Sequence, residues 1–306
     1  MTEQEYFDAF EEAREIIDVG DDKINRLNDR FAKSLLTNPR NKPILIDFIN
    51  DALFLEGEDV IADIEIASGE LVQNYVGMKL SRLDVSATFK NGYTCDIEIQ
   101  IADNRDFRKR APFYWAMRHV LKLHEGKDYT EIKSTICICM LAFTLFREEP
   151  GYRNAYSIRN DESGSLLSDD LRIVFLELPK FLRQVKTPKT GLERWLLYFS
   201  NRGGDEMNKA AEKDPAILMA MNFENAFWAN DQERENYFAT QKFILDSLSI
   251  ERRHERQLQE AMEQGMEQGV TREKIDIAKK MLARNMTPDV VADLSGLSLE
   301  EIAKLN

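Results

Sequence analysis

The sequence predicts a mixed α/β fold, and three observations support this class. Apolar and polar residues alternate over 60–71 and 78–103, which indicates strands, and apolar runs over 134–146 and 171–181 indicate further strands. Apolar residues spaced three and four apart indicate helices before, between and after these segments. The order is helix, strand, strand, strand, helix, strand, strand, which is not the regular alternation of a parallel α/β protein.

The helices of the first part have recognisable ends. Helical spacing predicts helices over 3–18, 21–36, 43–57 and 107–126, and a polar loop over 147–169. Asn38-Pro39 ends the second helix and Gly57 ends the third. Pro112 is tolerated in the first turn of the fourth helix, and Gly126 lies past its end. We expect residues 1–185 to form the core domain.

From about residue 190 the pattern is helical. Helices are expected over 191–201, 214–230, 231–249 and 252–274. We expect 186–250 to pack on the core and 251–306 to form a linker helix followed by two short helices. Thr287 and Ser298 are their predicted N-caps, and Gly296 makes the turn between them. This pair is either a helix-turn-helix unit or a plain helical hairpin for packing or self-association, which would make the protein a homo-oligomer.

The composition fits a protein of the cytoplasm. The chain has 306 residues, a formal net charge of −13 and 43% hydrophobic residues, which is enough for a sizeable core. No apolar run approaches the ~18 residues that span a bilayer, and the acidic N-terminus lacks the pattern of a signal peptide. Three cysteines without CxxC spacing argue against a disulfide framework and a zinc site. We therefore expect no membrane partner.

Charge is distributed unevenly along the chain. Residues 1–29 hold ten acids and three bases, whereas residues 105–133 hold eight Lys or Arg and four acids. The basic segment follows directly after the strand "CDIEIQI" at 95–101, which carries acids on one of its two faces. Two interpretations of the basic segment stay open, a solvated helix surface and a surface that contacts phosphates.

The turn "KNGY" at 90–93 decides which side chains of the predicted hairpin share a face. A two-residue Asn-Gly loop pairs residues whose numbers add up to 183 and places Asp84 on the apolar face. A three-residue loop, Lys90 to Gly92 with Gly92 left-handed, pairs residues whose numbers add up to 182. Asp84 then faces Glu98, and the acids gather on the face opposite to the isoleucines. We therefore predict the three-residue loop.

Asp84 and Glu98 would repel each other across this hairpin. The repulsion is ~1 kcal/mol in water-like surroundings and ~4 kcal/mol at an effective dielectric constant of about 20. A divalent cation would offset it, because two carboxylates and the carbonyl of Ile99 are hard oxygen ligands that suit Mg²⁺ or Mn²⁺. Such a site can activate a water molecule at a phosphodiester. The alternative is an exposed hairpin whose acids pair with neighbouring Lys or Arg.

Several segments stand together in a recognisable order, namely Asp84, the run Glu98-Ile99-Gln100, Arg110, Tyr114 and "GKDY" at 126–129. Further along the chain come "ERWLLYF" (193–199), "RENYFATQKFILD" (234–246) and "LSGLSLEEIAKL" (294–305). Together these segments resemble the PD-(D/E)XK nuclease superfamily, and in particular its recombination-promoting nuclease / putative transposase family of bacteria. The resemblance implies a four-stranded mixed sheet flanked by helices, with metal ligands on the central hairpin and an all-α C-terminal region.

The resemblance also assigns roles. It implies that Asp84 and Glu98 bind Mg²⁺ or Mn²⁺ and that Gln100 stands where the superfamily usually has Lys. Gln100 can orient a water molecule but cannot act as a general base. Asp29 matches an acidic position on an early helix and is either a further metal ligand or a surface acid. The implied nucleic-acid contacts come from the basic segment and are Arg105, Arg108, Lys109, Arg110, Tyr114 and Arg118.

The predicted function is a metal-dependent DNA endonuclease, a phosphodiester hydrolase that takes part in recombination, mobile-element or anti-phage biology. Its catalytic residues would be Asp84, Glu98 and Gln100. The alternative is a catalytically impaired protein with the nuclease fold that acts as a DNA-binding or assembly module. RNA and branched substrates are also open.

Overall fold

A mixed six-stranded sheet organises the computed structural model, which describes residues 3–20, 23–67, 85–102, 106–120, 122 and 128–305. The strands are β1 (Ile64–Ala67), β2 (Val85–Phe89), β3 (Thr94–Gln100), β4 (Thr135–Leu141), β5 (Arg153–Tyr156) and β6 (Leu171–Glu177), in the order β1-β2-β3-β4-β6-β5. The predicted mixed α/β class is confirmed, although the described part holds more strands than the four that the family resemblance implied.

The strand directions define two edges of the sheet. β3, β4 and β6 are parallel to one another, whereas β1–β2, β2–β3 and β5–β6 are antiparallel pairs. The three parallel strands therefore all begin at one edge, the N-terminal edge, and all end at the opposite, C-terminal edge. Positions along β3 fix where each side chain lies between these two edges.

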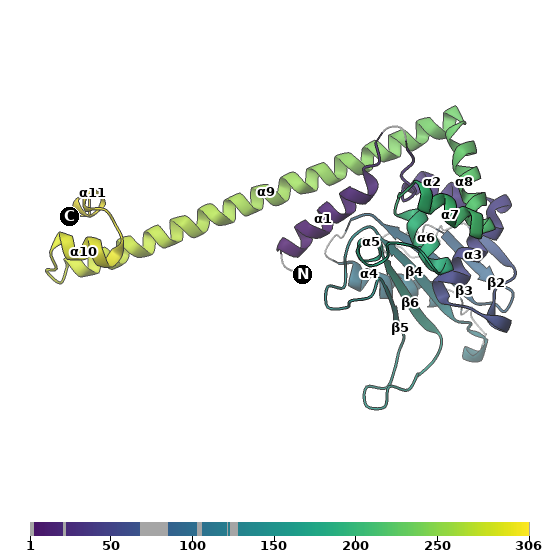
Figure 1. The fold of residues 1–306 in the computed structure, drawn as a ribbon. Coiled ribbons are helices and arrows are strands. Elements are labelled where there is room, and N and C mark those ends of the chain that lie inside the picture. The colour runs from purple at the N-terminus through teal and green to yellow at the C-terminus, as the bar shows by residue number, and fades with distance from the viewer. Residues whose placement is uncertain are drawn as a thin grey trace, which may run out of the picture. The chain divides into compact units, whose positions relative to one another are not determined.

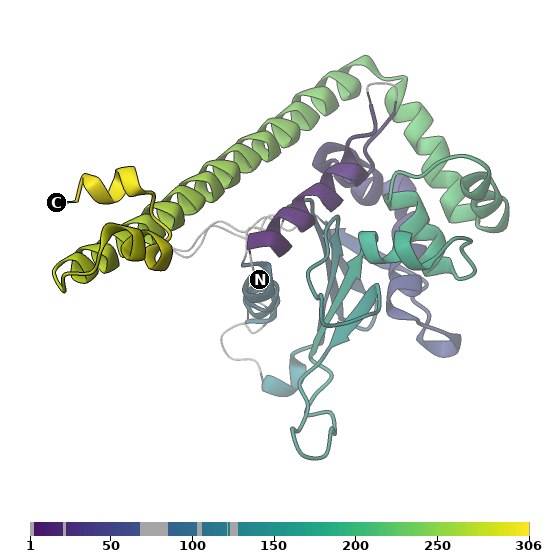
Figure 2. The same ribbon diagram turned by 60° about the vertical axis from the view of Figure 1, so that its left-hand side comes forward.

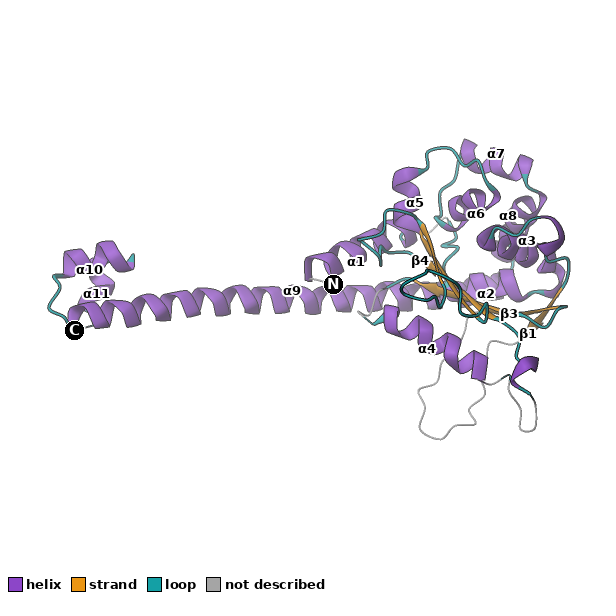
Figure 3. Ribbon diagram, turned by 90° about the horizontal axis from the view of Figure 1, so that it is seen from below, coloured by secondary structure: helices purple, strands orange, loops and turns teal. Residues whose placement is uncertain are grey.

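Helices cover both faces of the sheet. The helices before the long C-terminal one are α1 (Glu3–Ile17), α2 (Asp29–Thr37), α3 (Lys42–Leu53), α4 (Phe107–Val120), α5 (Leu178–Gln184), α6 (Gly191–Phe199), α7 (Asp205–Lys213) and α8 (Pro215–Trp228). Figure 1 shows their arrangement around the strands. α4 lies on one face, and α3, α6, α7 and α8 lie on the other (Figures 2 and 3). The sheet is thus the middle layer of three.

The core lies between the sheet and the α3 layer. β4 is buried along its whole length, and apolar side chains of β2 and β3 such as Val85 and Ile97 are fully buried. Aromatic rings join the helices of this layer, because Phe48 of α3 contacts Trp195 and Phe199 of α6 at ring-centroid distances of 5.8 and 5.5 Å. This packing fixes the face of β3 that carries isoleucine.

The β2–β3 hairpin has the predicted register. Val85 pairs with Ile97, Ser86 with Asp96 and Ala87 with Cys95, so the residue numbers of each pair add up to 182. Gly92 has a φ of +85°, and its amide donates to the carbonyl of Phe89 (2.9 Å). The three-residue loop is confirmed over these positions, whereas Asp84 lies outside the described residues.

Some element boundaries differ from the sequence prediction for local reasons. α2 begins at Asp29 and not at residue 21, because the Asn28 side chain caps it by accepting from the amides of Arg30 and Phe31. α3 ends at Leu53, where Phe54 adopts the left-handed conformation, so Gly57 is not its stop. Short 3-10 helices lie at Pro39–Asn41 before α3, at Gly57–Asp59 after α3, and at Tyr129–Glu131 before β4.

Other predictions missed whole elements or placed a residue wrongly. The predicted loop 147–169 contains β5, and the predicted strand 171–181 ends at Glu177, where α5 begins with Pro179 in its first turn. α7 was not predicted as a helix. Pro112 lies in the interior of α4, beyond its first turn, and residues 123–127 at the predicted end of that helix lie outside the described part.

The C-terminal part is built on one long helix. α9 (Asp231–Leu282) is continuous for 52 residues, so the helices predicted separately over 231–249 and 252–274 are one. Two compact units divide the chain, Met1–Leu248 and Ser249–Asn306. In the first unit the hydroxyl of Tyr237 accepts from the amide of Asn25 (2.8 Å).

The second unit has its own small core. α10 (Pro288–Ser295) and α11 (Leu299–Ala303) pack on the end of α9 through Ala278, Val291, Leu297 and Ile302. The predicted turn at Gly296 (φ +67°) and the capping box of Ser298 are confirmed, whereas the Thr287 side chain makes no cap hydrogen bond. None of the helices in the described part has the length and apolarity needed to cross a membrane.

The positive φ of Gly92 predicts the cost of a substitution there. Gly92→Ala should lower the free energy of unfolding by about 1–2 kcal/mol, because an L-residue is strained in this conformation. Its added Cβ would also lie 3.0 Å from Cγ of Lys133. Urea denaturation measures the change. Gly203→Ala is the control, since a Cβ at Gly203 meets no atom within 4 Å and its φ is not in the left-handed range. Equal stability of the two variants would contradict this account of the hairpin loop.

Candidate active site

The polar face of β3 is buried beneath α4. The side chains of Asp96, Glu98 and Gln100 alternate with those of the isoleucines and point toward α4, as the strand pattern predicts. Asp96 is fully buried, and only 3% of Glu98 is exposed. Carboxylates so far from water need a cation or hydrogen bonds, because the loss of hydration disfavours their charge.

Arg118 of α4 supplies the cation for Asp96. Its Nε lies 3.4 Å from Oδ1 of Asp96, and its Nη2 donates a hydrogen bond to the hydroxyl of Ser86 on β2. Among the described residues, no group donates a hydrogen bond of normal geometry to either Asp96 oxygen, so the ion pair is the main compensation. Burial raises the pKa of Asp96, and the charge of Arg118 only partly opposes this. Arg118, which the resemblance assigned to nucleic acid, is thus engaged inside the protein.

The C-terminal half of α4 and Lys122, two residues beyond its end, are fixed to the N-terminal edge of the sheet. Nε1 of Trp115 donates to the carbonyl of Thr135 (2.9 Å). Nζ of Lys122 donates to the carbonyls of Lys133 (3.0 Å) and Ser134 (2.9 Å). Burial lowers the pKa of Lys122 to about 8. These contacts hold α4 across β3 and β4.

Glu98 and Gln100 form a pair near the C-terminal edge. Nε2 of Gln100 donates to Oε2 of Glu98 (3.1 Å). Glu98, Cys139 and Phe175 lie side by side on β3, β4 and β6, and Phe107 at the start of α4 packs on Phe175 with a ring-centroid distance of 6.2 Å. The pair therefore lies in an apolar row, where a carboxylate is a strong ligand for a hard cation.

The structure describes some of the other predicted site residues and not others. Asp84 and Arg105 lie outside the described residues. Ile99 lies between the paired side chains, and its own side chain packs against the apolar core. Asp29 begins α2, is exposed, and forms an ion pair with Lys33 (2.8 Å). Within the described chain, the structure thus brings together Glu98 and Gln100 and gives Asp29 a different partner.

The basic side chains at the start of α4 fall into two groups. Arg110 and Tyr114 share a face, as their spacing predicts, and Nε of Arg110 donates to the Tyr114 hydroxyl (2.9 Å). Lys109 is exposed. Arg108 is engaged by Glu148, with an Nη1–Oε1 distance of 2.7 Å, and it also donates to the carbonyl of Leu145. Nη1 of Arg110 also lies 3.5 Å from Oδ1 of the exposed Asp106. This pair is long and lies at the surface, so Arg110 stays a candidate for a phosphate contact together with Tyr114 and Lys109.

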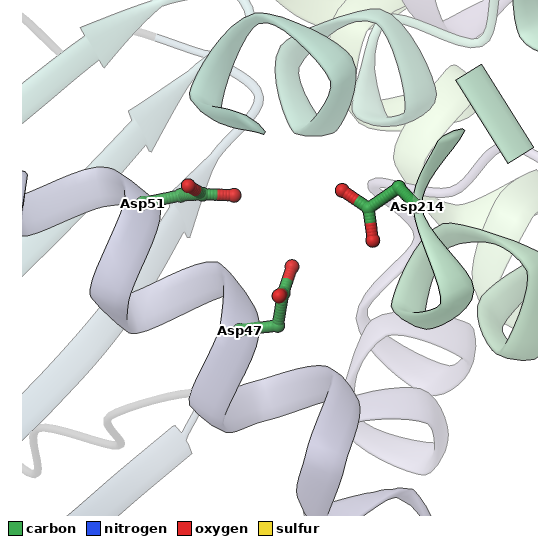
Figure 4. A group of neighbouring side chains, drawn as sticks. All are labelled: Asp47, Asp51 and Asp214. Carbon is green, nitrogen blue, oxygen red and sulfur yellow. The ribbon is translucent and has the colours of Figure 1, made fainter. Parts of the chain in front are cut away.

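A second acidic cluster lies on the other side of the sheet and was not predicted. Carboxylate oxygens of Asp47, Asp51 and Asp214 lie within 4.8 Å of one another (Figure 4). Asp47 and Asp51 are one turn apart on α3, and Asp214 caps α8 by accepting from the amides of Ala216 and Ile217. The i, i+4 spacing on α3 was visible in the sequence, but the approach of Asp214 depends on tertiary packing.

The cluster is only partly neutralised. Asp47 accepts from Nε1 of Trp195 (2.8 Å), and Asp214 accepts from Nε of Arg194 (3.0 Å). Burial and the charges of Asp47 and Asp214 raise the pKa of Asp51 to about 7. Two states are chemically open to these oxygens, a shared proton or a bound hard cation.

Comparison with known protein families identifies the family to which the chain belongs. A mixed sheet with helices on both faces is the kind of fold that the sequence resemblance implied. The family model described as PD-(D/E)XK nuclease family transposase matches residues 26–253. The chain belongs to this PD-(D/E)XK nuclease family. Comparison with curated proteins gave no match, and comparison with solved structures gave none either.

The buried ion pair makes a prediction about stability. Arg118→Met should lower the free energy of unfolding by about 3 kcal/mol at pH 7, because Asp96 is left charged without its partner. The loss should shrink when Asp96→Asn is added. Chemical denaturation of the single and double variants measures both effects. Arg14→Met is the control, since the Arg14–Asp18 pair is exposed and such pairs contribute less than about 1 kcal/mol. A loss in the double variant as large as in Arg118→Met would contradict the proposed role of Asp96.

The aspartate cluster predicts a pH dependence. Because the folded-state pKa of Asp51 is raised to about 7 from 3.8, the folded protein holds this proton more tightly than the unfolded chain. The contribution of Asp51 to stability therefore falls as the pH rises from about 4 to above 7. Asp51→Asn should raise the free energy of unfolding at pH 8 by roughly 1 kcal/mol, a value reduced for partial exposure. Denaturation at pH 5 and pH 8 tests this, with exposed Asp161→Asn as the control. A variant that is less stable than the wild type at pH 8 would rule the cluster out as a site of repulsion.

Proposed function

We propose that the protein is a metal-dependent endonuclease that hydrolyses DNA phosphodiester bonds. The observation that carries the proposal is the buried Glu98, which is hydrogen-bonded to Gln100 near the start of a basic helix, in a chain of the PD-(D/E)XK nuclease family. This part of the site offers an acid in an apolar row and exposed cationic groups on the helix that follows. Hydrolysis of a charged backbone needs both kinds of group.

The donor set suits Mg²⁺ or Mn²⁺. Glu98 and Asp84, which directly precedes β2 in the sequence, would hold the ion together with the carbonyl of Ile99. The ion, when bound, supplies Lewis-acid stabilisation of the phosphate and a water molecule of lowered pKa. Gln100 orients the Glu98 carboxylate through its amide hydrogen bond and leaves its carbonyl oxygen to orient a water molecule.

The start of α4 provides the substrate contacts in this proposal. The Arg110 guanidinium is linked to the Tyr114 hydroxyl, so its orientation is fixed, and exposed Lys109 precedes it. A guanidinium can contact two phosphate oxygens at once, which suits a backbone ligand. DNA is the proposed partner, and Arg118 contributes by holding α4 in position and not by touching DNA.

One observation favours a second function, DNA binding without cleavage. Gln100 occupies the position where the superfamily usually has Lys, and an amide supplies no cationic charge and no general base. A protein with this site could bind DNA through α4 and leave it intact. The two functions differ in whether the protein cleaves DNA. Removal of the Glu98 carboxylate should abolish cleavage under the first function and should leave DNA binding unchanged under the second.

Plasmid cleavage tests the proposal. With Mg²⁺ or Mn²⁺, the wild type should nick or cut plasmid DNA, and Asp84→Asn and Glu98→Gln should each lower the rate at least 100-fold, because each removes one charged ligand. Glu65→Gln is the matched control, since Glu65 lies in the similar stretch "DIEIA", is exposed on β1, and should leave the rate unchanged.

Thermal unfolding gives a readout that does not depend on cleavage. Mg²⁺ should raise the midpoint of the wild type and of Glu65→Gln, and the increase should vanish when residues 84 and 98 are both neutral. Intact plasmid at every metal concentration, together with DNA binding that both acid variants retain, would support the second function and reject the first.

A further inference from the structure

An open cavity lies at the N-terminal edge of the sheet, on the face that α3 covers. Its volume is about 440 Å³, within the range of small-molecule sites. Two of its lining residues, Arg172 of β6 and Ile136 of β4, are paired in the sheet, and their side chains lie on the same face as that of Ile97. Glu98 points to the opposite face. The cavity is therefore a site of its own.

Positive charge gathers at this cavity without matching carboxylates. Arg159 and Arg172 line it, and burial together with the charge of Arg172 lowers the pKa of the nearby Arg153 to about 10. Within the described residues, none of these three guanidiniums forms an ion pair with a carboxylate, although the protein carries a net charge of −13. Asp169, a carboxylate in the lining, accepts a hydrogen bond from the Tyr93 hydroxyl (3.2 Å). Guanidiniums gathered in this way attract an anion.

The C-terminal end of α3 offsets only part of this charge. Nε of Arg153 donates to the carbonyl of Ala52 (2.9 Å), and Nη2 of Arg172 donates to the carbonyl of Leu53 (3.3 Å). The C-terminus of a helix carries roughly half a negative elementary charge, which is a fraction of the charge of two guanidiniums. Nη2 of Arg153 is also buried and finds no partner in the described structure. A net positive charge therefore remains beside the cavity.

The two arginines of the lining keep donors that the described part of the protein does not use. Nε of Arg159 donates to the hydroxyl of Ser157 (3.0 Å), and its Nη1 donates to the carbonyl of Gly164 (2.9 Å). Arg172 uses Nη2 for the carbonyl of Leu53. A guanidinium has five N–H donors, so both side chains are oriented by the protein and still have donors for a ligand.

Hydroxyl groups in the lining add further donors. Only 3% of Ser134 is exposed, and its hydroxyl forms no hydrogen bond among the described residues, although buried polar groups normally have a partner. The oxygen of Ser157 accepts from Arg159, which leaves its own hydrogen to donate. The unused groups of the lining are thus mainly donors, and they suit a ligand with several acceptor oxygens.

We propose that this cavity binds a phosphate group, held by the guanidiniums of Arg159 and Arg172 and by the hydroxyls of Ser134 and Ser157. A phosphate has more acceptor oxygens than a carboxylate, so it uses more of these donors at once. The group is either inorganic phosphate or the phosphate of a small monoester, since both present the same oxygens. Its binding does not depend on the proposed cleavage of DNA.

Calorimetric titration of the protein at constant ionic strength tests the proposal with four probes: inorganic phosphate, glycerol 3-phosphate, glycerol and acetate. At least one of the two phosphates should bind at least tenfold more tightly than glycerol and acetate, because these lack the phosphate group. Arg159→Gln and Arg172→Gln should each weaken this binding at least fivefold, and Ser134→Ala at least threefold. Exposed Arg202→Gln, on the loop before α7, is the control and should bind within twofold of the wild type.

The outcomes separate the two sources and the two proposals. Tighter binding of glycerol 3-phosphate than of inorganic phosphate would favour a monoester, the reverse order would favour the free ion, and the site stands in both cases. If neither phosphate binds the wild type, if acetate binds as tightly as phosphate, or if the arginine variants bind like the wild type, the proposal is overturned. Arg159 is exposed, so Arg159→Gln decides the matter should Arg172→Gln unfold. Glu98→Gln should bind phosphate like the wild type, so failure of cleavage and failure of this site are distinguishable.

Discussion

The burial of carboxylates on β3 is the constraint on which the rest of the structure depends. A strand with isoleucine on one face packs well against the α3 layer, and this forces Asp96 and Glu98 toward the opposite side. Covering that side with an apolar helix would leave an uncompensated buried charge. The helix that covers it must therefore bring a cation to Asp96, and Arg118 does so. The basic segment after the acidic strand is in part a requirement of folding.

This requirement divides α4 into two halves with different roles. Arg118 and Trp115, with Lys122 just beyond the helix, attach one end to the N-terminal edge of the sheet through an ion pair and carbonyl contacts. The other end carries the Arg110–Tyr114 pair toward the edge at which β3 ends with Gln100. A helix anchored at one end keeps its other end at a fixed distance from the strand. The Glu98–Gln100 pair therefore has the Arg110–Tyr114 pair as a neighbour that is held in place, as the proposed active site requires.

Local chemistry explains which parts of the fold could be predicted. The hairpin register could be predicted because, of the two loops considered, the three-residue loop with Gly92 left-handed keeps the acids and the isoleucines on opposite faces. β5 was missed because "RNAY" carries no apolar alternation. It is the outermost strand on its side of the sheet and pairs with β6. α5 was missed because its residues continue the apolar run of β6, so that only Pro179 hints at a change.

The candidate site was predictable in kind but not in its contacts. The spacing of Glu98 and Gln100 places both on one face of a strand, and the structure adds the hydrogen bond between them. Nothing in the spacing says whether a basic residue on the next helix points at solvent or at a buried acid, so the role of Arg118 depended on the packing of α4. The same holds for Asp214, which meets Asp47 and Asp51 only because α8 begins beside α3.

The position of the three cysteines has a consequence for redox chemistry. Cys95, Cys137 and Cys139 lie on adjacent central strands, and at most 2% of each is exposed. Burial raises the pKa of all three thiols, so the reactive thiolate is scarce while the strands stay paired. Alkylating reagents and oxidants would reach them only when the middle of the sheet opens. The rate of thiol modification would therefore report how often the central strands of the sheet separate. These are the strands that carry the candidate site.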